Sequence, residues 1–505
     1  TTASNNVAVG DSALTANTTG DSNVAVGYAA LDANTTGTQN TAMGRDALGA
    51  NATESNLTAI GFDAAKLATT ATHITAIGSK SLDALTTGNF NTAVGYDSAG
   101  GTTTGASNTA VGYAALVANT TASNNTAVGK EALTANTTAS NNVALGYFAL
   151  KANTEGYGNT AVGTSALLTN VTHDKNTAVG FEALKTSVGD GNTAMGYEAM
   201  EANTSGTYNV AIGFRALDAN TTASNNTAVG TNCLTANTTG TDNVAVGADS
   251  LDANTTASNN TAMGRHALGA NTTGHSNTAV GAAALDANTT AAGNTGIGYA
   301  AGGSVSTGGS NTLIGYQAGQ DTVALATGSN NTIIGQNCRT SATDSANQVV
   351  LGQNCAGGED HQVTIGSASG VIRNEFDTDN AWTQSSDVRK KKDIEDAVLG
   401  LDFVNDLRPV TYEWKPNNEF PEDFAEYGET NHMTLGVRMH GLVAQEVKVA
   451  LDRTGVERFA GWQEDSDGSQ RISKEMFVFP LIKAIQELSA EVEELKSKMH
   501  DKCEE

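Results

Sequence analysis

The chain has 505 residues, of which 27 are Lys or Arg and 53 are Asp or Glu, so its formal net charge is −26. That length is enough for several domains. So acidic a chain is a poor candidate for binding nucleic acid or an anionic membrane through its net field, and no apolar run approaches the ~20 residues that span a bilayer. We therefore expect no nucleic-acid partner and no membrane insertion.

From its start to about residue 366 the chain repeats the motif Asn-(Thr/Val)-Ala-Val-Gly followed by a polar turn. The closing glycine recurs every 17 residues from Gly10 to Gly180 and, after one step of 16, from Gly196 to Gly315. It then recurs irregularly up to Gly366. So short a period predicts a parallel β-solenoid with one coil per repeat. At ~4.8 Å per coil, the 22 coils predict a rod of roughly 100 Å.

The columns of the repeat predict one short strand per coil. Thr or Val stands three residues before each glycine, and Val, Ile, Leu or Met stands one before it, so these two positions share a strand face that successive coils pair in register. Ala stands two before the glycine in the first 17 coils, on the opposite face. The glycine permits a positive φ at a corner, and the asparagine of the motif can bond the backbone at a turn.

We expect the alanine face to be covered by other copies of the chain. A 17-residue coil looks too thin to enclose much core, and the alanine column, which includes Ala127, would let several chains approach a common axis. The array resembles the left-handed β-roll heads of trimeric adhesins and the repeat shafts of tail fibres, and this resemblance implies a homotrimer. Towards the end of the array the column changes, which predicts repacking there, to Gly296, Leu313, Ile333, Val350 and Thr364.

Other candidate sites in the array have plain explanations. The Asn-Xaa-Thr tripeptides are expected to be turn residues rather than glycosylation sites, and the histidines form no metal-ligand pattern, so we expect no metal and no cofactor. Three cysteines follow a register glycine by three residues and are predicted to be small buried residues: Cys233, Cys338 and Cys355. Four tyrosines directly follow the glycine, where packing between coils or weak contacts to a host glycan or protein receptor are both possible: Tyr28, Tyr96, Tyr113 and Tyr147.

The composition changes near residue 380. Residues 1–380 hold 11 Lys or Arg and 27 Asp or Glu. Residues 381–505 are a third as long but hold 16 Lys or Arg and 26 Asp or Glu. All four prolines and all three tryptophans also lie after residue 380. This change predicts a domain boundary. The chain begins inside a repeat without methionine, and we expect a further N-terminal part that attaches or exports it.

A serine and a lysine five residues apart stand at this boundary. Ser386 and Lys391 form the minimum set for Ser-Lys nucleophilic catalysis, in which an uncharged amine takes the hydroxyl proton while the oxygen attacks a carbonyl. On its own the pair is a weak signal, because serine and lysine are common and a solvated basic turn is the plainer interpretation.

The flanking motifs favour the catalytic pair over the basic turn. With them, residues 386–505 resemble the autoproteolytic intramolecular chaperone domain at the C-terminus of phage tail fibres and endosialidase-type tailspikes. The resemblance implies cleavage between Ser385 and Ser386, with Ser386 as nucleophile and Lys391 as its partner. Lys390 departs from the apolar residue expected there. The motifs are, in order, Ser386–Arg389, Lys391–Ile394, Gly400–Val404, Leu407–Trp414, His440–Val447 and Phe479–Leu488.

The expected chemistry needs an uncharged Lys391. An ordinary lysine, with a pKa of ~10.4, is protonated at neutral pH and cannot act as a base. Burial on folding and the neighbouring cations Arg389, Lys390 and Lys392 would destabilise the charge. We therefore expect the cut to follow assembly, in cis or between chains.

The C-terminal residues predict a short coiled coil after Pro480. The heptad pattern by itself favours a dimer, whereas the long array should set a trimer. The apolar stripe consists of Leu481, Ile485, Leu488, Val492, Leu495 and Met499.

Together these features predict a mainly β chain with a solenoid shaft over 1–366, a linker over 367–385, a small α+β chaperone and self-cleaving peptidase domain over 386–478 and a coiled-coil helix over 479–505. The expected function is a trimeric tail-fibre-type shaft whose C-terminal domain directs trimerisation and cuts itself off once, as a single-turnover endopeptidase. The expected location is a virion tail fibre or the cell exterior. The alternative is a bacterial surface adhesin with the same modules and an anchor elsewhere.

Overall fold

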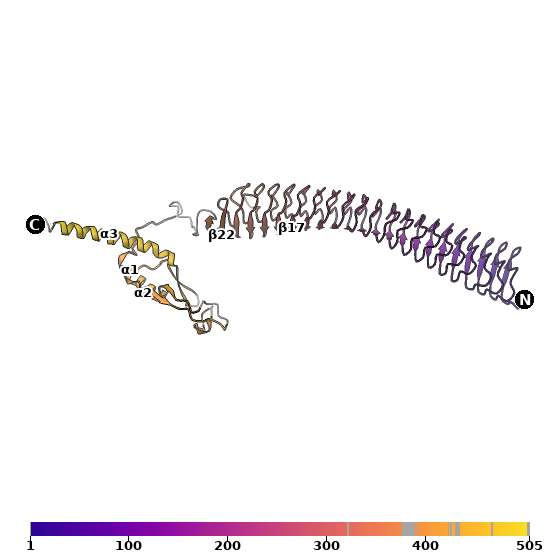
Figure 1. Ribbon diagram of the computed structural model, residues 1–505, viewed down its shortest axis with the longest axis horizontal. Coiled ribbons are helices and arrows are strands. Elements are labelled where there is room, and N and C mark those ends of the chain that lie inside the picture. Colours follow the sequence, from indigo (N-terminus) through magenta and orange to yellow (C-terminus); the bar gives the residue numbers. More distant parts are fainter. Residues whose placement is uncertain are drawn as a thin grey trace. The chain divides into compact units, whose positions relative to one another are not determined.

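The structure is a computed structural model that describes residues 2–320, 323–375, 388, 391–422, 424, 427–429, 435–465 and 468–501 (Figure 1). The chain divides into two compact units, Thr1–Gln384 and Ser385–Glu505, which are described separately below. The fold class predicted from the sequence, a parallel β-solenoid followed by a small α+β region and a long helix, is confirmed.

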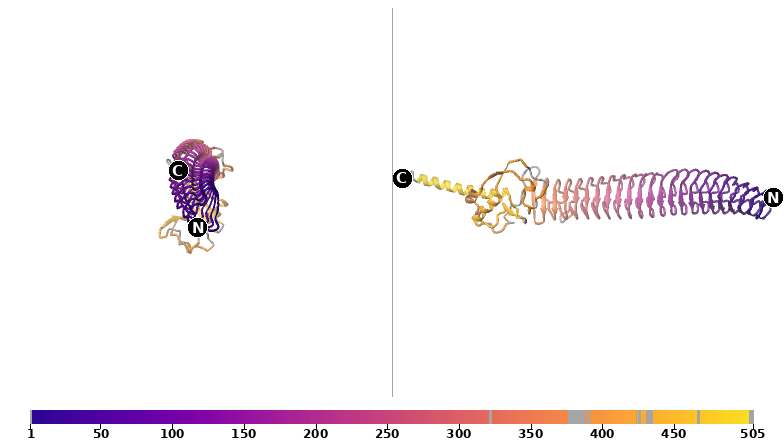
Figure 2. Two further views of the ribbon diagram at one scale, coloured as in Figure 1. Left: turned by 90° about the vertical axis from the view of Figure 1, so that its right-hand side faces the viewer. Right: turned by 90° about the horizontal axis from the view of Figure 1, so that it is seen from below.

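The first unit is a stack of coils in which one short strand per coil pairs in parallel with the strand of the next coil (Figure 2). The register is the one the repeat predicts: Val7 pairs with Val24, and Ala8 with Ala25. The strands are β1 Val7–Val9, β2 Val24–Val26, β3 Thr41–Met43, β4 Thr58–Ile60, β5 Thr75–Ile77, β6 Thr92–Val94, β7 Thr109–Val111, β8 Thr126–Val128, β9 Val143–Leu145, β10 Thr160–Val162, β11 Thr177–Val179, β12 Thr193–Met195, β13 Val210–Ile212, β14 Thr227–Val229, β15 Val244–Val246, β16 Thr261–Met263, β17 Thr278–Val280, β18 Thr295–Ile297, β19 Thr312–Ile314, β20 Thr332–Ile334, β21 Val349–Gln353 and β22 Gln362–Ser367.

The array ends in a hairpin. β23, Gly370–Glu375, pairs antiparallel with β22 and so lies within the segment expected to be a linker. Because β23 runs the opposite way, the parallel stacking of coils stops at this strand.

The register glycines are required by backbone geometry. Their φ angles lie between 126° and 157°, as expected for a corner that L side chains rarely adopt. A Cβ at Gly44 would also lie 2.2 Å from the carbonyl oxygen of Gly61 in the next coil. The tight stacking of coils therefore excludes any side chain at this column.

The alanine column faces the interior of its own coil, which corrects the expectation that it faces other chains. Ala127 is fully buried in the single chain, as are its register partners Ala110 and Ala144. The opposite wall of the coil covers it with an Ala-Leu pair such as Ala30-Leu31, three and four residues after the glycine. A 17-residue coil thus encloses a core, because leucines at this turn adopt positive φ angles and occupy the interior.

Near the end of the array the large core residue stands on the strand and the small one at the turn, the reverse of the earlier coils. Leu313 replaces the strand alanine, and Gly302 and Gly319 replace the turn leucine. A Cβ at Gly302 would lie 2.4 Å from Leu313 Cδ1, and one at Gly319 would lie 2.7 Å from Leu313 Cδ2. The expected repacking is therefore an internal exchange of volume within the coil.

Two columns of buried asparagine hold the polar side of each coil. Asn40 Nδ2 and Asn51 Nδ2 both donate to the carbonyl of Glu54, at 2.7 and 3.1 Å. The Oδ1 of Asn40 accepts the backbone N–H of the next coil at 3.0 Å. Both asparagines are replaced together by Leu57 with Ala68, and by Ile74 with Leu85. The apolar side chains at these positions are buried, so the polar core is replaced as a unit in those two coils.

The second unit is a small α+β domain around the aromatic cluster of Phe403, Phe459 and Phe477. α1 packs on α2 and α3, and α2 contacts β26 and β27. The elements are α1 Leu401–Asp406, β24 Val410–Tyr412, β25 Met439–Gly441, α2 Ala444–Thr454, β26 Trp462–Glu464, β27 Gln470–Ile472 and α3 Val478–Asp501, with short 3-10 turns at Asn417–Glu419 and Lys474–Phe477.

Candidate cleavage junction and fibre surfaces

The predicted catalytic junction lies at the start of the second unit. Ser385, Ser386, Arg389 and Lys390 fall outside the described residues, so the structure does not bring Ser386 and Lys391 together or separate them. Lys391 is described and exposed, and its backbone N–H donates to the carbonyl of Val388 at 3.1 Å. The Ser386–Lys391 dyad and the Ser385–Ser386 cut stay predictions.

The segment that follows Lys391 is exposed throughout residues 391–398. Its ion pair between Lys392 and Asp393, at 3.9 Å, joins two strongly exposed side chains and contributes little. The chain enters the core only at Leu399 and Gly400. A single copy therefore does not supply the burial that Ser-Lys chemistry needs at Lys391.

The motif Gly400–Val404 fixes the end of this segment. Leu401 N–H donates to Glu487 Oε2 of α3 at 2.6 Å, which satisfies one of the free donors at the start of α1. A Cβ at Gly400 would lie 2.1 Å from the same carboxylate oxygen, so only glycine fits without displacing Glu487. Phe403 is 1% exposed and stacks on Phe477 with ring centroids 6.3 Å apart. The C-terminal helix is thus bonded directly to the chain that leads from the junction.

Two ion pairs link α2 to α1 and to the segment that follows α1. Arg408 donates its Nε–H to Glu446 Oε2 at 3.1 Å, and this bond lowers the pKa of the Glu446 carboxyl below its ordinary value. Arg453 Nη1 lies 3.2 Å from Asp406 Oδ2 and ties the end of α2 to the end of α1. Both pairs are solvent-exposed, so they position the elements more than they stabilise them.

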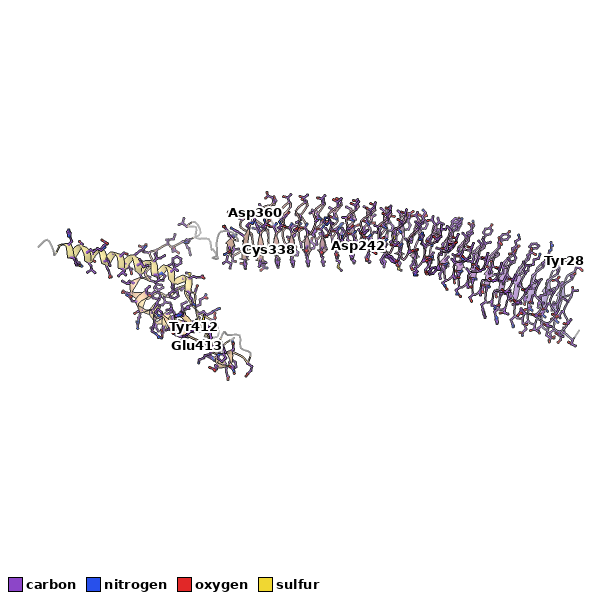
Figure 3. The ribbon with its side chains drawn as sticks, in the orientation of Figure 1. Tyr28, Asp242, Cys338, Asp360, Tyr412 and Glu413 are labelled. Carbon is purple, nitrogen blue, oxygen red and sulfur yellow. The ribbon has the colours of Figure 1, made fainter. Side chains whose placement is uncertain are left out.

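The tyrosines after the register glycines pack against neighbouring coils. Tyr96 and Tyr113 stack with ring centroids 5.5 Å apart, and Lys130 Nζ lies 5.8 Å from the Tyr113 ring and 5.6 Å from the Tyr147 ring. Tyr28, near the start of the array in Figure 3, has the Arg45 guanidinium 5.9 Å from its ring centroid. Packing between coils therefore accounts for these residues, although about half of each ring remains exposed.

The array cysteines are fully buried, as predicted. Burial is the main cause that raises the pKa of the thiols of Cys233, Cys338 and Cys355. A buried thiol that resists deprotonation is a poor nucleophile and a poor metal ligand. These residues act as small core side chains.

Three carboxylates of the array, on Glu182, Glu198 and Glu201, have oxygens within 4.8 Å of one another. Lys185 lies among them, with Nζ 2.9 Å from Glu182 and 3.1 Å from Glu201. The lysine supplies the positive charge that such a group requires, so the cluster is explained as an ion-pair network between coils.

The outer strand face is the apolar face that the coil leaves uncovered, whereas the sequence analysis expected the alanine face to be uncovered. The residues before each register glycine are apolar and half-exposed to exposed along the array, as at Met195, Ile212 and Met263. The hydrophobicity of both strand faces was visible in the sequence. The missing signal was the turn leucine, which shows which of the two faces the coil covers by itself.

Comparisons with known proteins concern the second unit. Among the described residues, no helix is long and apolar enough to cross a bilayer. Neither the comparison with curated proteins nor that with solved structures gave a match. Residues 386–456 match the family model Peptidase_S74, described as the chaperone of endosialidase, which confirms over those residues the resemblance seen in the sequence.

Proposed function

We propose that this chain is a tail-fibre-type shaft, in which the C-terminal domain directs the association of three copies and then cuts the chain between Ser385 and Ser386. The observation that carries the proposal is the position of the family match, which begins at Ser386, directly after a β-solenoid and a change in composition. A peptidase-type chaperone that begins at the predicted nucleophile fits a domain released by its own cut. The assembled shaft would stand outside the host cell or on a virion.

The outer strand face supports the assembly of several copies. Large contiguous apolar surfaces are rare on monomeric proteins and mark interaction sites. Here a column of Val, Ile, Leu and Met side chains continues from coil to coil beside a column of Thr and Val. A surface that repeats from coil to coil is complementary to a partner with the same repeat. A second copy of the chain, lying parallel to the first, has that repeat.

The C-terminal helix supports the same arrangement. Its heptad residues are 40–69% exposed along α3, whereas Ala484 on another face is buried and Glu487 bonds α1. The helix therefore uses one face for its own domain and leaves an apolar stripe for other helices. We assign three copies on the resemblance to trimeric shafts.

The proposed cut is a transfer of one acyl group followed by hydrolysis. Ser386 Oγ loses its proton to Lys391 Nζ and attacks the carbonyl carbon of Ser385. The bond from that carbon to the Ser386 nitrogen then breaks, and the nitrogen takes the proton from Lys391 Nζ and leaves as a free amine. This produces an ester between the two residues. Water then hydrolyses the ester, which restores the Ser386 hydroxyl and leaves a carboxylate on Ser385.

The test is to express the full chain beside Ser386→Ala and Lys391→Ala and to weigh the products denatured and native. Wild type should give fragments 1–385 and 386–505, and each variant a full-length chain that still forms trimers. A variant that is still cut would remove that residue from the mechanism. A wild-type chain that stays monomeric would refute the assembly.

A further inference from the structure

The second unit carries an open groove between its two small sheets and the start of α2. Its volume is about 530 Å³, and its apolar lining includes Tyr412 at the end of β24, which Figure 3 labels, together with Met439 on β25 and Ile472 on β27. Tyr412 and Trp414 both line it, and their rings meet edge to face with centroids 5.3 Å apart. Trp414 is 42% exposed, and a second hollow of about 330 Å³ continues beyond it.

The rim of this groove is positively charged. Arg471 and Lys474 both line it. Arg471 pairs with Asp465 at 2.5 Å, whereas Lys474 has no ion-pair partner among the residues that the structure describes. An apolar floor with a cationic rim favours a peptide that combines apolar and acidic side chains.

The segment between the junction and α1 has this composition. Ile394 and Val398 are 64% and 72% exposed, and the segment also carries Asp393, Glu395 and Asp396. In an extended chain Ile394, Asp396 and Val398 point to the same side. All three side chains would therefore face the groove together, the two apolar ones against its apolar lining and the carboxylate within reach of a rim cation.

The contact is not made within one copy, because there the segment is exposed and the groove is open. A contact between a segment of one copy and a groove of the next is heterologous, and three copies related by rotation close it into a ring. Copies held together by α3 and by the array would bind each other's segments at a high effective concentration.

We propose that residues 391–398 of one copy lie in the groove of a neighbouring copy, with Ile394 and Val398 on the apolar floor and Asp396 beside Lys474. This inference rests on the proposed trimer. Lys391 is the first residue of the docked segment, so docking covers the junction only after assembly. The self-cleaving site is then completed by two copies, and an isolated copy leaves it solvated and inactive.

The test is a directed disulfide between differently tagged full-length chains, both carrying Ser386→Ala to prevent cutting and Cys503→Ser to remove a competing thiol. One chain carries Asp396→Cys and the other Lys474→Cys, and the co-expressed assembly is oxidised with copper phenanthroline and dioxygen. The expected product is a disulfide-linked pair that carries both tags. In the matched control Glu457→Cys, just beyond the opposite end of α2, replaces Lys474→Cys and should give no such product.

Absence of the product above the control level would overturn the proposal. In a further chain that carries both Asp396→Cys and Lys474→Cys, a disulfide formed only within that chain would overturn the proposal equally. The proposed function is tested separately, by cleavage of wild type and its loss in Ser386→Ala. The docking can therefore fail while the proposed function stands, and the proposed function can fail while the docking stands.

A charge exchange gives a second readout on chains that can be cut. Asp396→Lys should slow cleavage several-fold because its ammonium faces Lys474. Adding Lys474→Asp to that variant should restore the rate, since the pair is reversed. Equal rates in all these chains, or slowing that the second substitution does not relieve, would contradict the docked arrangement.

Discussion

The assignment of the two strand faces can be tested with neighbouring residues of one strand. In β13, Ala211 is fully buried inside the coil, and Ile212 is 38% exposed on the outer face between Met195 and Val229. We consider a triple variant, Met195→Asp, Ile212→Asp and Val229→Asp, beside the single variant Ala211→Leu. The first changes three successive coils of the outer face, and the second changes only the interior.

The expected magnitudes follow from burial. Full burial of such an apolar side chain contributes ~1.5–3 kcal/mol, and about two-fifths of Met195 and of Ile212 remains to be buried on assembly, so these six side chains per trimer contribute roughly 4–7 kcal/mol, to which the less exposed Val229 adds. The carboxylates add a desolvation cost. Leucine at position 211 overpacks a filled core, which costs ~1–3 kcal/mol in each chain.

The assay is circular dichroism for strand content together with native mass after stepwise heating. The triple variant should keep its strand content and dissociate at a lower temperature, whereas Ala211→Leu should lose strand content on milder heating whether or not copies associate. Trimers of the triple variant that dissociate at the wild-type temperature would refute the outer face as the interface.

Three further outcomes are expected. Phe403→Ala should destabilise the second unit by ~3–5 kcal/mol, seen as a lower urea midpoint of its tryptophan fluorescence, with Phe403→Leu milder. Gly319→Ala should lower the thermal stability of the array because the added methyl group meets Leu313. The double variant with Leu313→Ala should recover part of the lost thermal stability. Burial and the Asp97 carboxylate raise the pKa of the Asp83 carboxyl, so its charge costs stability above the ordinary pKa near 3.9; Asp83→Asn should raise the unfolding temperature at pH 7 and leave it unchanged at pH 3.

The regular parts of the fold could be predicted because their causes are local. The period of the glycines predicts one coil per repeat, and the alternation within each strand predicts its two faces. The heptad pattern that begins at Leu481 predicts the exposed apolar stripe of α3. The interior could not be predicted in the same way. Leu31 has a φ of 53°, a conformation rare for leucine, and sequence patterns do not reveal that such a turn points its side chain inward.

The candidate site shows a similar division. Motif spacing identified the chaperone domain, and the family match over 386–456 agrees with it. The bond from Glu487 to Leu401 joins residues 86 positions apart, and the groove at Trp414 depends on two separate sheets. Contacts of this kind arise from tertiary packing and have no local signature in the sequence.

The exchange of large and small core residues at Gly302, Leu313 and Gly319 distinguishes the last coils from the others, so it defines a fixed register along the array. Most of the first 17 coils have interchangeable interiors, so two chains shifted by one coil would fit almost as well as two aligned chains. Only the last coils differ enough to make such a shift costly. In the proposed trimer, alignment of the copies would therefore be set in the last coils, at the C-terminal end of the array, and proceed towards its start. Whole 17-residue blocks could then be gained or lost upstream, each changing the length by ~5 Å.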